Sequence, residues 1–406
     1  MLQLSILLIQ MYKQLFRKAW TFLGKDKILI TLLLTSAVYF VVYYVTDPVR
    51  PGGLITHFYG SSGPIQNFTG WFGYYDQGQY LQLANTLAHF RIHELASTYT
   101  YGIGYPLVAV PAIWLGFGKD PFVFFNFLTF CFSVCTTYYV AKKLISPFAG
   151  FIAGFGLLFA TPLIHYTDQP WNSTVCLFVM PVILIMLTFK KITHKHLLFL
   201  GFLLAWAFSA RYIDVLFLGT LSLAVIYRGS VKDLIKNSAY MFLGSLVLLV
   251  PVLYSHYHYF GSPLHTPYVN HLGIGGVDGS DQGLKAYSLR RVPRAGLALF
   301  LSPRLAGSTD GDRGLLIDFF WALAAIPGIA LLIKKKNHEV FFRTLLAVGL
   351  LACTFYLSFR ASTPGSLKYG ELHYFKMYWP CLAILASAYI DKVYTQANSL
   401  VKKRKA

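Results

Sequence analysis

An isolated carboxylate among aromatic side chains is the first feature of this sequence that could do chemistry. Asp76 is one of 16 acidic residues in a chain of 406 and lies in WFGYYDQGQYLQLANTLAHF, beside Tyr75 and Tyr80. Aromatic rings next to a carboxylate are typical of a sugar-binding cleft, although an aromatic belt at a membrane surface contains the same residue types. Asp76 followed by Gln79 also matches a helix capping box, so a general base and an N-cap are both open interpretations.

Arginine supplies a complementary chemistry, because its planar guanidinium group can bind two phosphate oxygens. In FSARYIDV, Arg211 and Asp214 lie within an apolar stretch, where charged side chains indicate either a functional site or a structural ion pair. The later segment KAYSLRRVPRAGLALFLSPRLAGSTDGDRG is rich in arginine, and attraction to anionic lipid headgroups is the simpler interpretation for any one of these residues. The candidate phosphate-binding residues are Arg211, Arg290, Arg291, Arg294 and Arg304.

The elements that must position these residues are membrane-spanning helices, which predicts an all-α fold. The sequence is 56% hydrophobic and 13% charged, against roughly 25% charged residues in a soluble domain. Its apolar runs approach the ~20 residues needed to cross the hydrocarbon core of a bilayer. We predict ten spans: Ile28–Val45, Pro121–Val140, Pro147–Tyr166, Asn172–Phe189, two short spans within Leu197–Tyr227, Ser238–Ser255, Leu315–Ile333, Val340–Phe359 and Leu372–Ile390.

The distribution of charge predicts how these spans are oriented. Basic residues gather at Lys13–Lys27, Lys142–Lys143, Lys190–Lys195, Arg228–Lys236, Lys334–Lys336 and Lys392–Lys405. If all of these clusters are cytoplasmic, the positive-inside rule accounts for most of the net charge of +19, and no nucleic-acid partner is needed. Gly102–Gly118 must then be a short interfacial segment, because counting it as a span would move the later clusters outside.

This orientation predicts one membrane domain in the cell membrane, with both termini in the cytoplasm. Residues 1–26 form an interfacial segment, residues 27–390 the transmembrane domain, and residues 391–406 a basic cytoplasmic tail. Two long loops, 46–120 and 257–313, lie outside, together with the turn that contains Asp168. An amphipathic helix is expected to start at Asp76, with Tyr80 and Ala84 on its apolar face and Gln79 on its polar face.

Several short motifs resemble the GT-C glycosyltransferases, multi-span enzymes that use polyprenyl-phosphate sugars. YYDQGQYLQLANTLAHF followed by TYTYGIGYPLVAVPAIWLGFG is similar to their first outer loop, with Asp76, Tyr80 and the Tyr105 of GYP in matching places. YFGSPLHTPY and ELHYFKMYWPCLAIL resemble elements at later spans. Gln77 and His373 stand where relatives often have an acid and an arginine. The layout is similar to that of protein mannosyltransferases and aminoarabinose transferases.

The resemblance implies transfer of a sugar, with inversion, from a polyprenyl-phosphate donor to a lipid, glycan or protein acceptor on the outer face. It implies that Asp76 is the base. One carboxylate together with arginine residues agrees with this reaction. A glycosidase normally uses two carboxyl groups, whereas a phosphate leaving group needs cations more than a proton. The predicted substrate cleft contains Tyr75, Tyr80, Tyr105, Asp168 and His373.

No cofactor is expected, because a monophosphate donor would not require a metal. A turn acid helps to bind metal in related oligosaccharyltransferases, but Asp168 has no second acid nearby, and a solvated turn is the favoured interpretation. Asp310 and Asp312 form a DxD, which binds metal in soluble nucleotide-sugar enzymes and also matches an ordinary turn.

Two alternatives to the glycosyltransferase remain open at this point. One is a polysaccharide polymerase or ligase that uses lipid-diphosphate glycans, which fits the arginine-rich second loop but leaves the first loop unexplained. The other is a flippase or transporter of lipid-linked sugars. A transporter predicts internal repeats with interrupted helices in both halves, and the break at Arg211 has no counterpart in the sequence.

Overall fold

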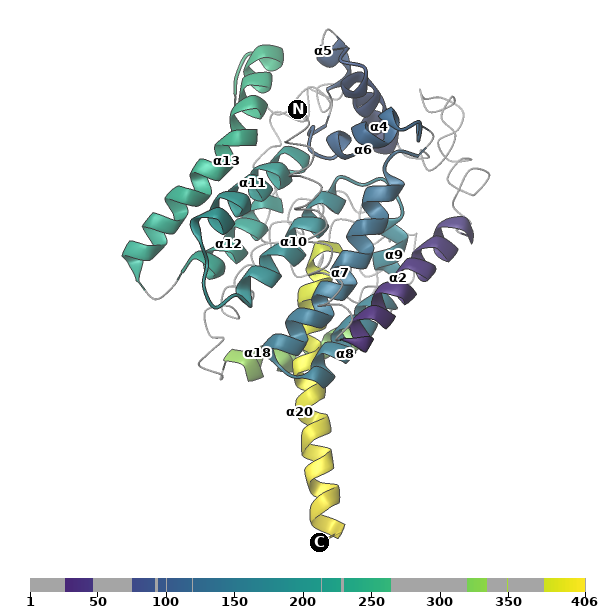
Figure 1. The fold of residues 1–406 in the computed structure, drawn as a ribbon, viewed down its shortest axis with the longest axis vertical. Helices are drawn as coiled ribbons and strands as arrows, with labels where there is room; N and C mark the ends of the chain where they lie inside the picture. The colour runs from purple at the N-terminus through teal and green to yellow at the C-terminus, as the bar shows by residue number, and fades with distance from the viewer. Residues whose placement is uncertain are drawn as a thin grey trace, which may run out of the picture.

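The computed structural model is a bundle of helices with one helix projecting from an end of the bundle (Figure 1). It describes residues 26–46, 75–91, 94–99, 101–118, 120–212, 214–227, 230–263, 320–333, 349 and 376–405. No strand occurs within these ranges. The predicted all-α class is therefore confirmed for the described part of the chain.

The bundle is built from long and short apolar helices. Among the described residues, three helices are long and apolar enough to cross a membrane: α2 (Lys27–Thr46), α7 (Val123–Leu144) and α13 (Val231–Phe260). Shorter apolar helices pack with them: α8 (Pro147–Leu158), α10 (Ser173–Leu187), α11 (His194–Ala210) and α12 (Asp214–Ile226). The short helix α18 (Ala325–Ile333) packs against the last helix of the chain. The chain is thus an integral membrane protein.

Two predicted spans are interrupted. The polar break predicted at Arg211 is confirmed, because α11 ends at Ala210 and α12 begins at Asp214. The third predicted span is divided into α8 and α9 (Thr161–Thr167), which the sequence reasoning did not foresee. Pro162 explains this division, since proline has no N–H to donate to the carbonyl oxygen of Leu158 and its ring would clash with that carbonyl group in a continuous helix. Apart from residue 349, the ninth predicted span lies outside the described residues, as does the interfacial segment before residue 26.

Helices α11 and α13 lie side by side, and glycine sets their separation (Figure 1). A Cβ atom at Gly201 would lie 1.7 Å from the backbone oxygen of Met241, and one at Gly244 would lie 1.9 Å from that of Leu198. Any larger side chain would therefore push the two backbones apart. Small residues are the usual means of close helix packing in membranes, where the hydrophobic effect contributes little to helix association.

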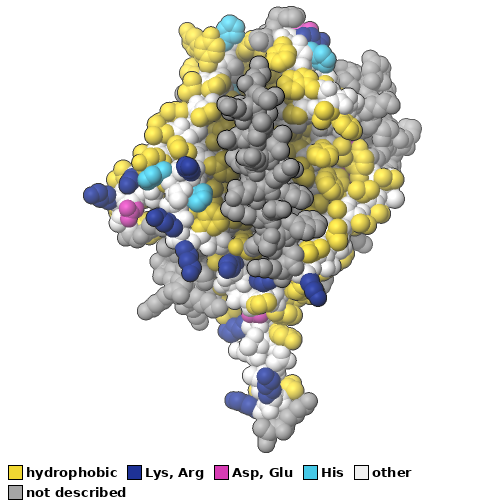
Figure 2. Space-filling model, viewed as in Figure 1, with side chains coloured by type: hydrophobic (Ala, Val, Ile, Leu, Met, Phe, Trp, Pro, Cys, Tyr) yellow, Lys and Arg dark blue, Asp and Glu magenta, His cyan; other side chains and the backbone are white. Residues whose placement is uncertain are grey.

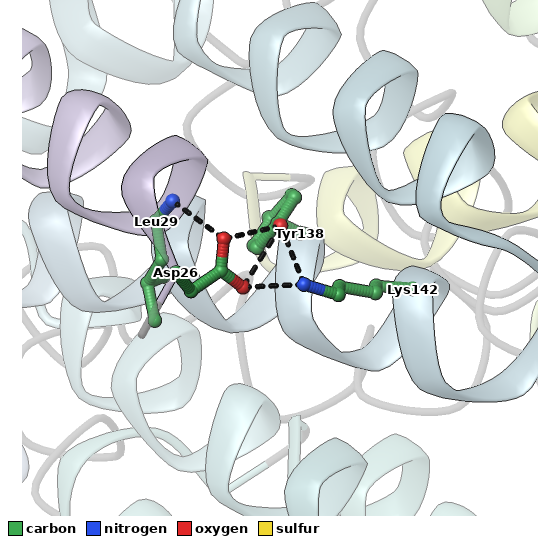
Figure 3. Close-up of polar contacts among 4 residues, drawn as sticks. All are labelled: Asp26, Leu29, Tyr138 and Lys142. Atoms are coloured by element: carbon green, nitrogen blue, oxygen red, sulfur yellow. Dashed lines mark hydrogen bonds and ion pairs between the residues drawn. The ribbon is translucent and has the colours of Figure 1, made fainter. Parts of the chain in front are cut away.

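A hydrogen-bonded carboxylate joins α2 to α7 at their shared end (Figure 3). Asp26 accepts hydrogen bonds from Lys142 Nζ at 2.6 Å, from Tyr138 Oη at 2.8 Å and from the backbone N–H of Leu29 at 3.3 Å. Burial raises the pKa of Asp26, but these hydrogen bonds outweigh it, so the pKa lies below its ordinary value. The cluster fixes the start of α2 against the last turn of α7.

The predicted C-terminal tail continues the last helix, α20 (Trp379–Lys405), which projects from the bundle in Figure 1. Asp391 at the base of the projection accepts a 2.6 Å hydrogen bond from Ser146 Oγ, and Tyr394 stacks on Phe148 with ring centroids 4.3 Å apart. In Figure 2 the visible Lys and Arg side chains lie mainly along the left edge and in the lower part of the view, towards this end, and hydrophobic side chains predominate among the other described residues. This arrangement is consistent with the positive-inside pattern.

Candidate active site

Asp76 lies in the first turn of α4 (Tyr75–Ala88), the helix predicted from its amphipathic pattern. The helix begins one residue earlier, so the carboxylate is inside the first turn rather than before it, where an N-cap would be. The partial positive charge of a helix N-terminus favours a carboxylate in this position. Its Oδ1 atom accepts a hydrogen bond of 2.5 Å from Tyr101 Oη, a length typical of a hydroxyl group bound to an ionised carboxylate.

The packing of α4 confirms its apolar face and corrects its polar face. Tyr80 is 2% exposed and Ala84 is fully buried, as predicted. Gln79 was predicted to face solvent but is 7% exposed. The reason is that α4 packs against both α5 (Leu95–Thr98) and α6 (Pro106–Trp114). With nine residues, α6 is too short to cross a bilayer, so Gly102–Gly118 forms no span here.

A group of aromatic rings lies beneath Asp76. The ring of Tyr80 packs edge-on against Tyr101, with centroids 5.2 Å apart, and against Tyr105, with centroids 5.5 Å apart. Tyr105 stacks on Phe122 at 4.6 Å and donates a hydrogen bond to Asn126 Oδ1 at 3.1 Å. Burial raises the pKa of Tyr105 well above its ordinary value, so its hydroxyl stays neutral and remains a donor. Tyr80 and Tyr105 therefore support the loop from within rather than lining an open cleft.

The GIGYP segment docks on the C-terminal end of α11. A Cβ atom at Gly102 would lie 2.3 Å from Ser209 O, and one at Gly104 would lie 2.5 Å from Ser209 Oγ. The backbone N–H of Gly104 donates to Ser209 O at 2.9 Å, and Trp206 Nε1 donates to Gly104 O at 2.8 Å. The two glycines are required because the backbones approach so closely. The loop that carries Tyr101 is thereby anchored to a membrane helix.

The break between α11 and α12 holds a buried ion pair. Arg211 has extended backbone geometry, with φ −157° and ψ 103°, where α11 ends. Its Nη1 atom lies 3.2 Å from Asp214 Oδ2, and the two side chains are 8% and 0% exposed. Of the two interpretations open from the sequence, the ion pair is the one whose geometry is present.

Lys376 adds a second buried cation next to this pair. It lies just before α20 and is fully buried. Its Nζ atom donates to the backbone oxygen of Tyr166 at 2.7 Å and to Thr174 Oγ1 at 2.6 Å. Its charge interacts electrostatically with those of Arg211, Asp214 and Asp168. Two basic and two acidic side chains therefore share one buried region: Arg211, Lys376, Asp168 and Asp214.

Asp168 lies in this buried region, at 1% exposure. The solvated turn favoured from the sequence is therefore wrong. The turn after α9 is held from inside the bundle: Asn126 Nδ2 donates to Gln169 O at 3.0 Å, and Asn172 Nδ2 donates to Ala210 O at 3.2 Å. These contacts join the turn to α7 and to the end of α11.

The YFGSP motif also reaches the break. His256, 1% exposed on α13, has its Nδ1 atom 3.3 Å from the backbone oxygen of Pro263 and its Nε2 atom 3.2 Å from Tyr212 Oη. A carbonyl oxygen only accepts hydrogen bonds, so Nδ1 carries the proton and Nε2 accepts from Tyr212. The end of α13 is thus joined to the residue that follows Arg211.

An apolar cavity of about 510 Å³ lies between α4, α6 and the end of α13 that is remote from α20 (Figure 1). Two stacked pairs, Phe90 with Trp114 and Tyr254 with His258, contribute to its lining. Leu87 lines it from α4, the helix that carries Asp76 in its first turn. The volume is within the range of small-molecule sites.

Solved structures share this arrangement of helices. An oligosaccharyltransferase of Archaeoglobus fulgidus, solved in complex with Zn and sulfate, aligns over 91% of this chain with a TM-score of 0.54 and 14% identity. The same organism's oligosaccharyltransferase AglB, in complex with an inhibitory peptide and a dolichol-phosphate, aligns over 94% with a TM-score of 0.55 and 12% identity. The fold is that of GT-C glycosyltransferases.

The GT-C likeness concerns the fold. The alignments cover 49% and 52% of the two archaeal chains, so this chain spans about half the length of the structures it matches. Comparison of the sequence with family models and with curated proteins gives no match. The fold predicted from the motif resemblance is confirmed, while the roles of individual residues remain predictions.

The GT-C fold brings some of the predicted site residues together. Tyr101 contacts both Asp76 and Tyr80, and Tyr80 in turn packs against Tyr105. Arg211 and Asp168 lie in the buried charged region. Tyr75 begins α4, but its side chain is outside the described part of the structure. Also outside it are Arg290, Arg291, Arg294, Arg304, Asp310, Asp312 and His373.

Two residues of the site were not foreseen in the sequence. Tyr101 was one of many aromatics in TYTYGIGYP, and its place just before the docked glycines was the available signal. Lys376 lies within the predicted span Leu372–Ile390, where a lone cation in an apolar run indicates a buried partner. Within the described ranges, no group of three or more His, Cys, Asp or Glu side chains could hold a metal ion.

Proposed function

We propose that this protein is an inverting membrane glycosyltransferase that transfers a sugar from a polyprenyl-phosphate donor to an acceptor on the outer face. The observation that carries the proposal is the Asp76 carboxylate, held by Tyr101 at the start of α4 within a GT-C fold. The archaeal neighbours are oligosaccharyltransferases, which supports glycosyl transfer in a membrane. The acceptor is a lipid, a glycan or a protein.

The proposed reaction needs one base and a stabilised leaving group. Asp76 removes the proton of an acceptor hydroxyl, whose oxygen attacks the anomeric carbon of the sugar from the face opposite the phosphate. The bond between that carbon and the phosphate oxygen breaks, and the lipid phosphate leaves with the electron pair. Cations next to the phosphate stabilise its charge. We assign this role to Arg211 and to the loop residues Arg290, Arg291, Arg294 and Arg304.

The apolar cavity suits the isoprenoid chain of such a donor. Its lining is largely hydrophobic and aromatic, and it includes Tyr254 of α13, a membrane-spanning helix. Leu87 and Asp76 belong to the same helix, eleven residues apart, which corresponds to about 16 Å along the axis. We propose that the isoprenoid chain of the donor lies in the cavity while its sugar phosphate reaches Asp76. AglB was solved with a dolichol-phosphate, which supports a lipid of this class.

The proposed topology follows from the charge pattern. It has ten spans, both termini in the cytoplasm and the site on the outer face of the cell membrane. The basic side chains around the projecting α20 support this orientation, because α4, α5 and α6 lie at the opposite end of the bundle (Figures 1 and 2). We propose no cofactor, since a monophosphate leaving group can be stabilised by arginine alone.

The test is transfer by the purified protein in detergent. Radiolabelled polyprenyl-phosphate sugars are supplied as a panel, together with an extract of membrane lipids and glycans. Asp76→Asn should abolish transfer, while the control Asp120→Asn should retain it. The control is matched because Asp120 also accepts a tyrosine hydrogen bond, from Tyr44 Oη at 2.6 Å. Near-normal transfer by folded Asp76→Asn would exclude Asp76 as the base.

A further inference from the structure

The Asp76 carboxylate accepts a short hydrogen bond from Tyr101, a residue of the first-loop segment TYTYGIGYP to which the resemblance assigned no role. The Oη–Oδ1 distance is 2.5 Å, and Tyr101 is 5% exposed. We propose that Tyr101 is a positioning residue, whose hydroxyl group holds the Asp76 carboxylate in a single orientation for proton removal. The inference rests on the proposed function for its catalytic meaning, and its test includes a measurement that needs no activity.

A short hydrogen bond of this kind has two effects on a carboxylate. It fixes the rotation of the carboxyl group, because one of its two oxygens is tied to a donor, and the direction of the other oxygen is then set. It also stabilises the charged form, since a hydroxyl donates more strongly to an ionised than to a neutral carboxyl group. A base that must be ionised and correctly oriented benefits from both effects.

Tyr101 can position another residue only if it is itself held in place. Its ring packs edge-on against the buried ring of Tyr80, and the next residue, Gly102, lies against the end of α11. The hydrogen bond from Gly104 N–H to Ser209 O fixes the same loop to the same helix. The hydroxyl group is therefore supported by a membrane helix rather than by a loop alone. Precise support of this kind is what a reacting group requires.

A purely structural role predicts something different. If the hydrogen bond only fastened α4 to the loop, its loss would lower stability but leave the pH dependence of the reaction unchanged. If it positions and stabilises the ionised carboxylate, its loss should move the acid limb of the activity profile to higher pH. Hydrogen bonds to charged groups are strong enough to produce a shift of about 1–2 pH units.

Tyr101→Phe is the decisive variant, because it removes the hydroxyl group and keeps the packed ring. Tyr99→Phe is its matched control: Tyr99 is 2% exposed in the same loop, and its hydroxyl lies 3.4 Å from Ser255 Oγ on α13 rather than near Asp76. Circular dichroism checks that both variants fold. The first measurement is kcat/KM for transfer as a function of pH. We expect Tyr101→Phe to show the shift and about tenfold lower kcat, and Tyr99→Phe to match the wild type.

The second measurement reads the carboxyl group directly. In the full chain in detergent, labelled with 13C-aspartate, the infrared band of Asp76 is assigned by its absence in Asp76→Asn and is then titrated. Its midpoint should rise in Tyr101→Phe and stay in place in Tyr99→Phe. An unchanged midpoint in Tyr101→Phe overturns the positioning role, whatever the activity. A shifted midpoint with an unshifted acid limb supports the coupling of Tyr101 to Asp76 and instead overturns the assignment of Asp76 as the base.

Discussion

Replacing Lys376 with methionine tests whether the buried charges stabilise the bundle. The ammonium group is fully buried and makes hydrogen bonds of 2.7 Å to Tyr166 O and 2.6 Å to Thr174 Oγ1. Methionine has a similar length but no donor, so both acceptors lose their partner and Asp168 loses a nearby cation. Because breaking a buried charge network costs about 3–5 kcal/mol, we expect the free energy of unfolding to fall by about 3 kcal/mol or more.

The assay is reversible unfolding in mixed detergent, followed by circular dichroism. Lys392→Met, at an exposed position on α20, is the control and should change the free energy of unfolding by about 0.5 kcal/mol or less. Adding Asp168→Asn to Lys376→Met should recover part of the loss, because the uncompensated carboxylate is removed with its cation. A loss below about 1 kcal/mol in Lys376→Met, or a double variant no more stable than Lys376→Met alone, would refute the network.

Two further predictions concern the ends of the bundle. Asp26→Asn should remove a pH-dependent contribution of about 1 kcal/mol or less. The pKa of Asp26 is lowered in the folded protein, so this contribution is present above the ordinary pKa of about 3.9 and is lost as the pH falls through the pKa of the folded state. Melting temperatures of the wild type and Asp26→Asn that change in parallel with pH would contradict it. Leu107→Trp, which fills the apolar cavity, should raise KM about tenfold for a long-chain donor and not for a short-chain one. Leu115→Trp, exposed on the same segment, is its control. An equal effect of Leu107→Trp on the long-chain and short-chain donors would place the isoprenoid chain outside the cavity.

The sequence predicted the features that depend on apolar periodicity and on breaks in it. The division at Arg211 and the helix that starts near Asp76 are both present, because charges in an apolar run and a helical repeat of apolar residues are local signals. Burial of Gln79 and Asp168 could not be predicted in the same way. It depends on which helices cover them, and the partner cation Lys376 is far away in the chain.

The site was predicted through its carboxylate but not through the group that holds it. Tyr101 is one of 28 tyrosines in the chain, and its place just before the glycines of GIGYP is a weak local signal that does not indicate which hydroxyl meets Asp76. Tyr80 and Tyr105 are buried in the structure, and their predicted place in a substrate cleft stays a prediction. The same residue types suit buried support and a cleft wall, and only packing distinguishes them.

The break between α11 and α12 also supplies polar groups that no side-chain motif records. A helix that ends leaves its last carbonyl oxygens without partners inside the helix. Here Ser209 O accepts from the backbone N–H of Gly104, and Ala210 O accepts from Asn172 Nδ2. One interruption between two apolar helices thereby recruits two separate segments, one leading to Asp76 and the other to Asp168. In an uninterrupted helix, later N–H groups would occupy these oxygens, and the two segments would have to be held by side chains alone.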